Sequence, residues 1–231
     1  MSNSESTFTL KTRSDLGATP KLNYWGAETE YGVLRNVLLG PVENYKWLKT
    51  SSVSKKSLRR KEKYDLNVAK QQYEEMVDAY ASADVVVHTH KADPELPYQI
   101  FARDSSIMTP YGAIITNMAQ WWRKGENYRA IETYKELGIP IYDFVTAGSF
   151  EGGDFNVIEP GCVLIGWEGE EGRSHLNAAN QIKGWFEREG WEVFVTDIDP
   201  FYVHIDLMVV MLAEKLAAVC LDSTDPKVVN W

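Results

Sequence analysis

The segment "GSFEGGDFNVIEPGCVLIGW" (residues 148–167) places two acids, Glu151 and Asp154, around a pair of glycines, directly before strand-like apolar sequence. The apolar runs on either side of residues 159–161 predict a β-hairpin with a short turn. Turn geometry explains the glycines, because glycine tolerates dihedral angles and close approaches that other residues avoid. It does not explain the acids, which stand at the open end of the hairpin.

The elements around this segment recur along the chain. Hairpin-like apolar sequences stand at residues 106–118, 155–167 and 206–220, and helical patterns precede them at residues 67–84, 126–138 and 173–190. A strand-like run follows each helix, at residues 85–90, 139–144 and 191–196. A fixed period, here about fifty residues, is typical of repeated supersecondary elements. The sequence therefore predicts an α/β fold built from repeats.

A short polar loop precedes each hairpin: "FARD" (residues 101–104), "EGGD" (151–154) and "HID" (204–206). Equivalent loops of a closed repeat array meet at one end of the array, so we expect one shared site. Its candidate residues are Asp104, Glu151, His204 and Asp206. Carboxylates match the N–H donors around a planar cation such as guanidinium, and histidine moves protons near neutral pH.

Each candidate residue also has a purely structural interpretation. A single aspartate often caps a turn, and a single histidine on an apolar stretch is more often a core residue than a catalyst. Recurrence at equivalent positions of a repeat favours the functional interpretation. In the same loops, we expect Arg103 to tie its loop down and Asp154 to bond turn amides.

Composition excludes several classes of protein. The 231 residues carry a net charge of −9, which argues against a nucleic-acid partner and suits a small cationic substrate. The two cysteines form no disulfide framework and fit a reducing cytoplasm. No apolar run is long enough to span a membrane, and the polar start has no signal core. The basic stretch at residues 51–63 predicts a solvated loop.

Metal binding has little support in the sequence. The spacings His88-x-His90 and His204-x-Asp206 are similar to metal motifs, but neither has the three or four ligands that a site needs. We therefore expect neither a metal nor another cofactor.

The order FARD, EGGD, HID, each before a hairpin, resembles the guanidino-group-modifying superfamily of arginine deiminases, dimethylarginine dimethylaminohydrolases and amidinotransferases. This resemblance implies a five-bladed αβ-propeller of ββαβ units, the pentein fold, with the active site on its axis. It covers roughly residues 25–231, which we expect to form one catalytic domain after a flexible segment at residues 1–24.

The resemblance also implies roles for individual residues. Carboxylates that grip the guanidino nitrogens correspond to Asp104, Glu151 and Asp206, and the general acid/base corresponds to His204. The substrate carboxylate would be bound by Arg173 at the start of a helix, with Arg129 as a weaker candidate. "EGGD", where amidinotransferases usually show "DAAD", favours a hydrolase. Tyr98, where deiminases tend to have asparagine, leaves the choice of substrate open.

The superfamily mechanism needs a cysteine near the C-terminus. Cys162 and Cys220 both lie in apolar runs and are expected to be small buried residues rather than nucleophiles. "DSTDPKVVNW" at the C-terminus predicts the start of a helix. We therefore expect a chain truncated within its last repeat, with the nucleophile beyond residue 231 and a complementing C-terminal chain or a homo-oligomer as its partner.

Three functions follow from the resemblance. The first is a deiminase or amidinohydrolase that acts on an arginine-like substrate through a covalent amidino intermediate. The second is an amidinotransferase that passes the amidino group to an amine, and the third is a non-catalytic binding protein of the same fold.

Overall fold

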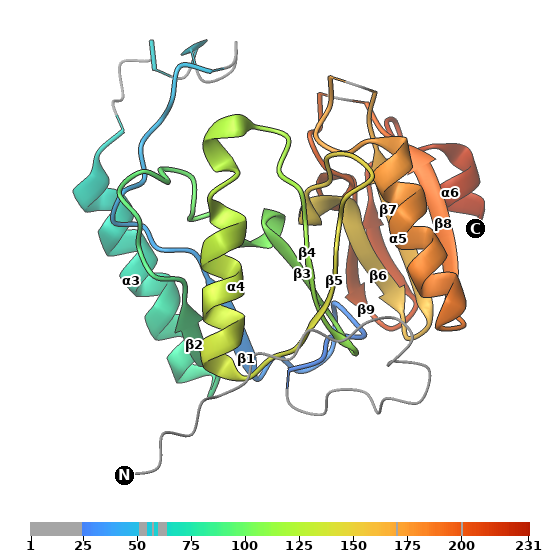
Figure 1. Cartoon of the computed structure of the whole chain (residues 1–231), viewed down its shortest axis with the longest axis horizontal. Helices are drawn as coiled ribbons and strands as arrows, with labels where there is room; N and C mark the ends of the chain where they lie inside the picture. Colours follow the sequence, from blue (N-terminus) through green and yellow to red (C-terminus); the bar gives the residue numbers. More distant parts are fainter. Residues whose placement is uncertain (1–24, 51–54, 57, 60–63, 170, 200) are drawn as a thin grey trace. The chain divides into compact units, whose positions relative to one another are not determined.

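The computed structural model describes residues 25–50, 55–56, 58–59, 64–169, 171–199 and 201–231 (Figure 1). The predicted segment 1–24 and most of the basic stretch 51–63 lie outside these residues. The chain divides into two compact units, one of them Leu34–Ala102 and the other residues 25–33 with Arg103–Trp231. One catalytic domain over residues 25–231 stays a prediction.

The smaller unit contains a parallel strand pair and, between the two strands, a 17-residue helix. Strand β1 (Asn36–Leu39) pairs with β2 (Val86–Thr89), and helix α3 (Leu66–Ser82) connects them. The helix begins after Asp65, whose carboxylate accepts a hydrogen bond from the Asn67 amide and so satisfies one of the free N–H groups of the first turn.

The larger unit begins with the first repeat. A short 3-10 turn, η1 (Ala102–Asp104), which straddles the boundary between the two units, leads into the antiparallel hairpin β3 (Ser106–Thr109) and β4 (Gly112–Ile115). The turn η2 (Trp121–Arg123) and helix α4 (Glu126–Leu137) then lead to β5 (Ile141–Phe144), which pairs parallel with β4. The helix ends at Gly138 with a φ of 69°, a left-handed conformation that glycine adopts without strain.

The second repeat has the same topology, and the third follows it. Turn η3 (Gly152–Asp154), hairpin β6 (Phe155–Glu159) and β7 (Cys162–Trp167), helix α5 (Leu176–Arg188) and β8 (Glu192–Asp197) form the second repeat. Turn η4 (Ile205–Leu207), hairpin β9 (Val209–Ala213) and β10 (Leu216–Val219), and helix α6 (Pro226–Asn230) form the third.

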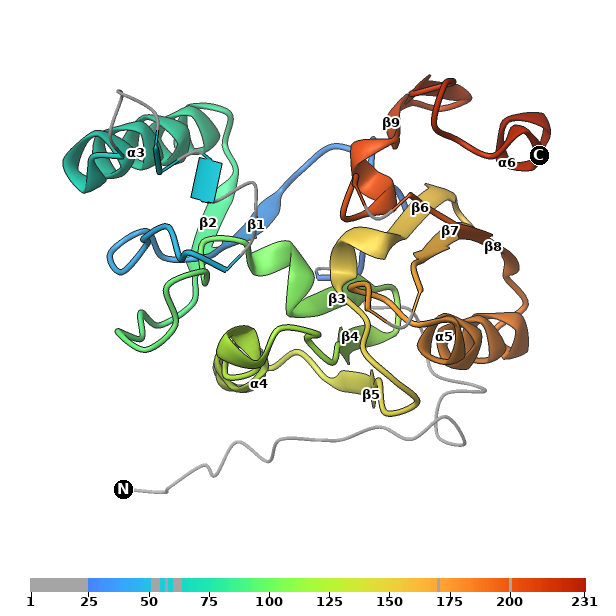
Figure 2. The same cartoon turned by 90° about the horizontal axis from the view of Figure 1, so that it is seen from above.

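The largest described hydrophobic core is formed by the strands of the first and second repeats together with helix α5. Helix α5 contacts β7 and β8 and lies along that sheet in both views (Figures 1 and 2). Its inward residues Ile182, Trp185 and Phe186 are almost fully buried. The indole N–H of Trp191 donates to the Tyr111 hydroxyl oxygen at 3.0 Å, which joins this core to the first repeat.

The structure confirms the predicted α/β class and the ββαβ repeat, with each predicted hairpin, helix and strand of the first two repeats in place. The five-bladed propeller stays a prediction, because the described residues form four separate small sheets and no closed ring of them. None of the described helices is both long and apolar enough to cross a bilayer.

Candidate functional site

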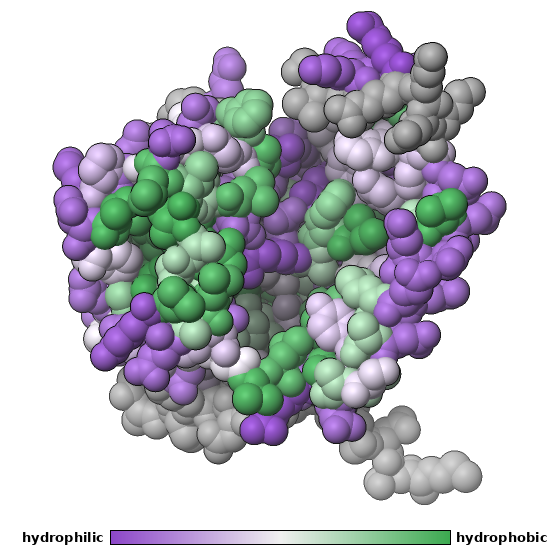
Figure 3. Space-filling model, turned by 180° about the vertical axis from the view of Figure 1, so that it is seen from behind, coloured by the Kyte–Doolittle hydropathy of each residue, from purple (hydrophilic) through white to green (hydrophobic). Residues whose placement is uncertain are grey.

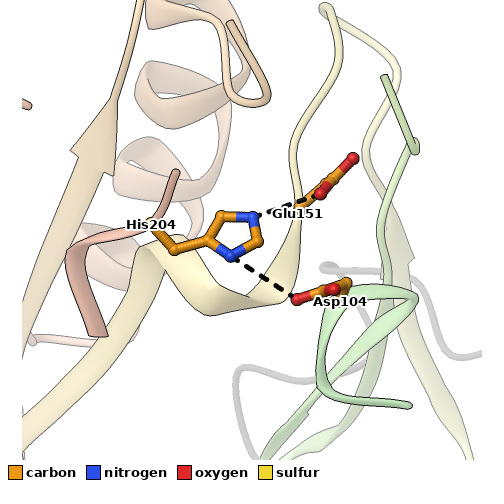
Figure 4. A group of neighbouring side chains, drawn as sticks. All are labelled: Asp104, Glu151 and His204. Atoms are coloured by element: carbon orange, nitrogen blue, oxygen red, sulfur yellow. Dashed lines mark hydrogen bonds and ion pairs between the residues drawn. The ribbon is translucent and has the colours of Figure 1, made fainter. Parts of the chain in front are cut away.

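Three predicted site residues meet inside the larger unit, each from a different repeat. Asp104 ends turn η1, while Glu151 and His204 precede turns η3 and η4. The His204 ring lies between the two carboxyl groups, with Nε2 3.1 Å from Glu151 Oε2 and Nδ1 3.8 Å from Asp104 Oδ1 (Figure 4). All three residues are buried, Glu151 completely. The structure thus brings equivalent loops together, and the catalytic roles of the residues stay predictions.

The glycine pair of "EGGD" permits this close approach. A Cβ atom at Gly152 would lie 2.0 Å from the carbonyl oxygen of Arg103, and one at Gly153 would lie 2.6 Å from the His204 ring. Side chains cannot occupy such space. The two glycines therefore let the loop of the second repeat touch the loops of the first and third repeats.

Arg123 is a site residue that the sequence analysis missed. From turn η2 its buried guanidinium donates to Asp104 Oδ2 at 2.7 Å and to both carboxylate oxygens of Glu126, and it lies 3.8 Å from Glu151. A buried arginine that bridges carboxylates fixes their positions. The acid three residues after Arg123, at the start of a helix, was the signal available in the sequence.

Glu151 stays ionised despite its burial. Burial acts to raise the pKa of this carboxyl, but the hydrogen bond to His204 and the charges of Arg173 and Arg123 outweigh it and hold the pKa below the ordinary value. Arg173 Nη1 lies 3.1 Å from Oε2, and the Ala119 amide donates to Oε1 at 3.3 Å. The carboxylate is thus held from several sides.

His204 is a cation at neutral pH. Burial acts to lower its pKa, but the hydrogen bond to Glu151 and the charges of Asp104, Asp154 and Glu151 raise it to about 9. An imidazolium between two carboxylates has a proton to give, so the arrangement suits a general acid.

Comparisons with known proteins give the family of the chain and its fold. The profile of the family described as "N,N dimethylarginine dimethylhydrolase, eukaryotic" matches residues 48–228. The chain belongs to this family. The resemblance to the guanidino-group-modifying superfamily is thereby confirmed. A sequence search of curated proteins gave no significant match.

Solved structures share the fold of this dimethylarginine dimethylhydrolase family member. The dimethylarginine dimethylaminohydrolase of Pseudomonas aeruginosa, complexed with citrulline, gives a TM-score of 0.70 at 19% identity and covers 87% of this chain and 75% of its own. The N-terminal domain of ArgZ, an arginine dihydrolase from Cyanobacteria, gives 0.70 at 18% identity, with 86% and 71% covered. The amidinotransferase SxtG from Microseira wollei gives 0.68 at 14% identity, with 87% and 71% covered.

The described contacts of Asp206 do not include the cluster of Asp104, Glu151 and His204. Its carboxylate accepts a hydrogen bond from Arg103 Nε at 2.7 Å, and Arg103 also reaches Glu30 and the side chain of Asn156. Arg103 therefore ties loops together, as its place beside an acid suggested. A role of Asp206 in gripping substrate stays a prediction.

The two predicted substrate arginines differ in position. Arg173 precedes α5 and points its guanidinium at Glu151. Arg129 lies on α4, where it pairs with Glu132 at 2.6 Å and stacks over the Tyr128 ring. Arg123, six residues before Arg129, is the arginine that contacts Asp104 in the cluster with Glu151 and His204.

Neither cysteine is fully buried, which corrects the expectation of two core residues: both thiols are half-buried and free. Cys162 stands at the turn of the β6–β7 hairpin, opposite Glu159, which lies five residues, or about 16 Å, along β6 from Asp154. Burial, with the charges of Glu192 and Glu159, raises the pKa of this thiol to about 11. The Cys220 amide donates to the Met208 carbonyl beside turn η4.

The Asp104, Glu151 and His204 cluster also has the spacing of a metal site, with one ligand atom from each residue within 4.8 Å of the others. A metal would need a deprotonated His204 and would compete with Arg123 and Arg173 for the carboxylates. These groups fit an organic cation better, and the absence of a cofactor stays a prediction.

Proposed function

We propose that this protein hydrolyses the guanidino group of an arginine-like substrate through a covalent amidino intermediate on a cysteine. The observation that carries the proposal is the buried imidazolium of His204 between Asp104 and Glu151. Family membership supports the chemical class of the substrate.

The carboxylates recognise the substrate cation. A guanidinium presents N–H donors around a planar edge, and Asp104 and Glu151 offer oxygens on two sides of His204. Arg173 is already paired with Glu151, so a substrate guanidinium must share or displace that contact. An arginine freed in this way is available for a substrate carboxylate.

The reaction transfers one proton out and one back. A thiolate attacks the guanidino carbon, and the amine leaves with the proton of His204, which produces a thiouronium and a neutral imidazole. A water molecule then gives a proton to His204 and adds to the same carbon. The C–S bond breaks, the added hydroxyl group gives its proton through solvent to the departed amine, which becomes an ammonium ion, and the neutral ureido product leaves with both the thiolate and the imidazolium regenerated.

The test uses the whole chain with arginine, N-methylated arginines and agmatine. Formation of citrulline, or of urea, with a mass adduct on a cysteine supports hydrolysis, and transfer to an added amine supports the amidinotransferase instead. Cys220→Ser and Cys162→Ser show which thiol, if either, carries the adduct. Saturable binding of the guanidine with neither adduct nor product, both for the chain alone and with the complementing C-terminal chain expected from the sequence, would support the non-catalytic alternative and contradict the proposal.

Two variants test the recognition groups. Asp104→Asn should weaken guanidine binding by about 2 to 5 kcal/mol, because it leaves buried charges without a partner. Arg173→Ala should weaken binding of arginine more than that of agmatine, which lacks the carboxylate. Equal effects on both ligands would remove the carboxylate role of Arg173.

A further inference from the structure

The residue before His204 has a strained backbone. Val203 adopts a φ of 70°, and the His204 amide donates to the Tyr202 carbonyl at 2.8 Å, so the three residues form a γ-turn. A β-branched residue is rarely found at positive φ, because its Cβ substituents collide with the backbone there. Such strain persists only where the surrounding structure holds it.

The residue after His204 is held by a buried carboxylate. Asp154 Oδ1 accepts a hydrogen bond from the Ile205 amide at 2.9 Å, and both residues are completely buried. A Cβ atom at Gly166 would lie 2.7 Å from Asp154 Oδ1 and 2.9 Å from Ile205 Cβ. The contact is therefore enclosed, with no room for the carboxylate to be displaced toward β7.

Turn η3, which carries Asp154, also covers one face of the His204 ring. Gly153, next to Asp154, packs directly on His204, because a Cβ atom there would overlap the ring. The strained turn on one side and the Asp154 bond on the other hold the backbone that carries the imidazole, and the ring points toward Glu151. Asp154 belongs to η3 and His204 precedes η4, so the restraint acts between repeats.

We propose that Asp154 is a positioning residue for His204. By holding the Ile205 amide, its carboxylate keeps the turn at Val203 closed and keeps His204 Nε2 on Glu151. Its catalytic consequence rests on the function proposed above, but the positioning itself does not. The alternative is that Asp154 only stabilises turn η4.

The charged groups that face His204 are Asp104, Glu151, Asp154 and Glu168. Burial raises the pKa of Asp154 itself to about 7, while the His204 charge and the hydrogen bonds from Ser174 and Ile205 act to lower it. Removal of the Asp154 charge alone therefore changes the titration of His204. A test of positioning must separate this charge effect from the loss of the hydrogen bond.

Two variants make that separation. Asp154→Asn removes the charge but keeps an oxygen that can accept from Ile205, whereas Asp154→Ala removes both. Histidine-selective isotope labelling of the whole chain and NMR titration give the pKa and ring signals of His204, with His88 and His175 as internal controls. We expect the pKa of His204 in Asp154→Ala to lie about one unit below that in Asp154→Asn, a tenfold difference in proton affinity.

Val203→Gly tests the strain directly. Glycine adopts a φ of 70° freely, so the turn no longer needs the clamp and the difference between Asp154→Asn and Asp154→Ala should shrink in this background. Should Asp154→Ala fail to fold, Val203→Gly alone carries the test. It should raise Tm and leave the pKa of His204 unchanged.

Either of two results overturns the proposal: equal His204 titrations in Asp154→Asn and Asp154→Ala, or an unchanged difference after Val203→Gly. If Asp154→Ala does not fold and only Val203→Gly can be measured, a fall in the pKa of His204 in Val203→Gly also overturns the proposal. None of these readouts uses turnover. A protein that proves inactive on every guanidine would contradict the proposed function and still answer whether Asp154 positions His204.

Discussion

The second and third repeats start from similar hairpins and differ in what covers them. In the second repeat, β8 extends the hairpin and α5 covers the sheet, so that the central residues of β7 are buried. In the third repeat, β9 and β10 form a two-stranded sheet among the described residues, and Val210, Leu212 and Leu216 are exposed. Hydrophobic side chains gather over this region on the side opposite to Figure 1 (Figure 3). Apolar sequence thus predicts a strand, and its neighbours decide whether it is buried.

The largest difference between the repeats should appear on truncation of their apolar side chains. Trp185→Ala removes a buried ring from α5 and should lower the free energy of unfolding by about 3 to 5 kcal/mol. Leu212→Ala, at a residue 58% exposed, should change it by less than about 0.5 kcal/mol. Urea denaturation of the two variants gives both values. Similar losses would mean that β9 is packed in solution.

The pH dependence of stability reports the contact between the two repeats. The pKa of His204, raised to about 9 in the folded protein, exceeds the ordinary 6.5. The imidazolium therefore stabilises the fold fully below about pH 6.5, and this contribution, about 3 kcal/mol, is lost as the pH rises through 9. Urea melts from pH 6 to 10 measure it. His204→Asn should flatten that part of the curve, and an equal slope in this variant would assign the loss to other groups.

A methyl group added at Gly153, which packs on the His204 ring, should lower the free energy of unfolding by a smaller amount. Gly153→Ala places Cβ against the His204 ring and should cost about 1 to 3 kcal/mol while it displaces the imidazole from Glu151. Gly169→Ala is the matched control, because no atom lies within 4 Å of its Cβ position. Thermal melts and guanidine binding compare the two. If both variants bind and melt alike, the loops of the second and third repeats are less closely packed than described.

Amide hydrogen exchange should show the smallest effect, without any mutation. Amides of β7 lie between two paired strands, whereas β10 pairs only with β9 among the described residues. Local opening needs less free energy where fewer buried contacts are broken. We therefore expect exchange in β10 to be at least about tenfold faster than in β7, a difference of about 1.4 kcal/mol in opening free energy. Equal protection would indicate that β10 has a partner in solution.

The sequence predicted what depends on local pattern and period. Hairpin turns, the glycine end of α4 and the convergence of Asp104, Glu151 and His204 all follow from the repeat. Each is set by residues near in sequence or by an equivalent position in the next repeat, so spacing alone carries the information.

The contacts that the sequence did not predict depend on how individual side chains pack and pair, which the repeat period does not set. The buried Arg123 bridge and the pairing of Asp206 with Arg103 depend on the relative placement of turns 19 and 103 residues apart. The strained φ of Val203 depends on a clamp from another repeat. The exposure of Cys162 depends on how neighbouring elements cover its strand. Such features need the packed structure.

Glu151 and His204 occupy the same place in successive repeats, immediately before turns η3 and η4. In these two repeats the position points inward, whereas in the first repeat it holds Phe101, which is 45% exposed. The repeated turn sets where the side chain before it lies, and the residue type at that position decides whether the repeat contributes an acid or a base. The carboxylate and the imidazole that meet at 3.1 Å thus come from equivalent positions of two successive repeats.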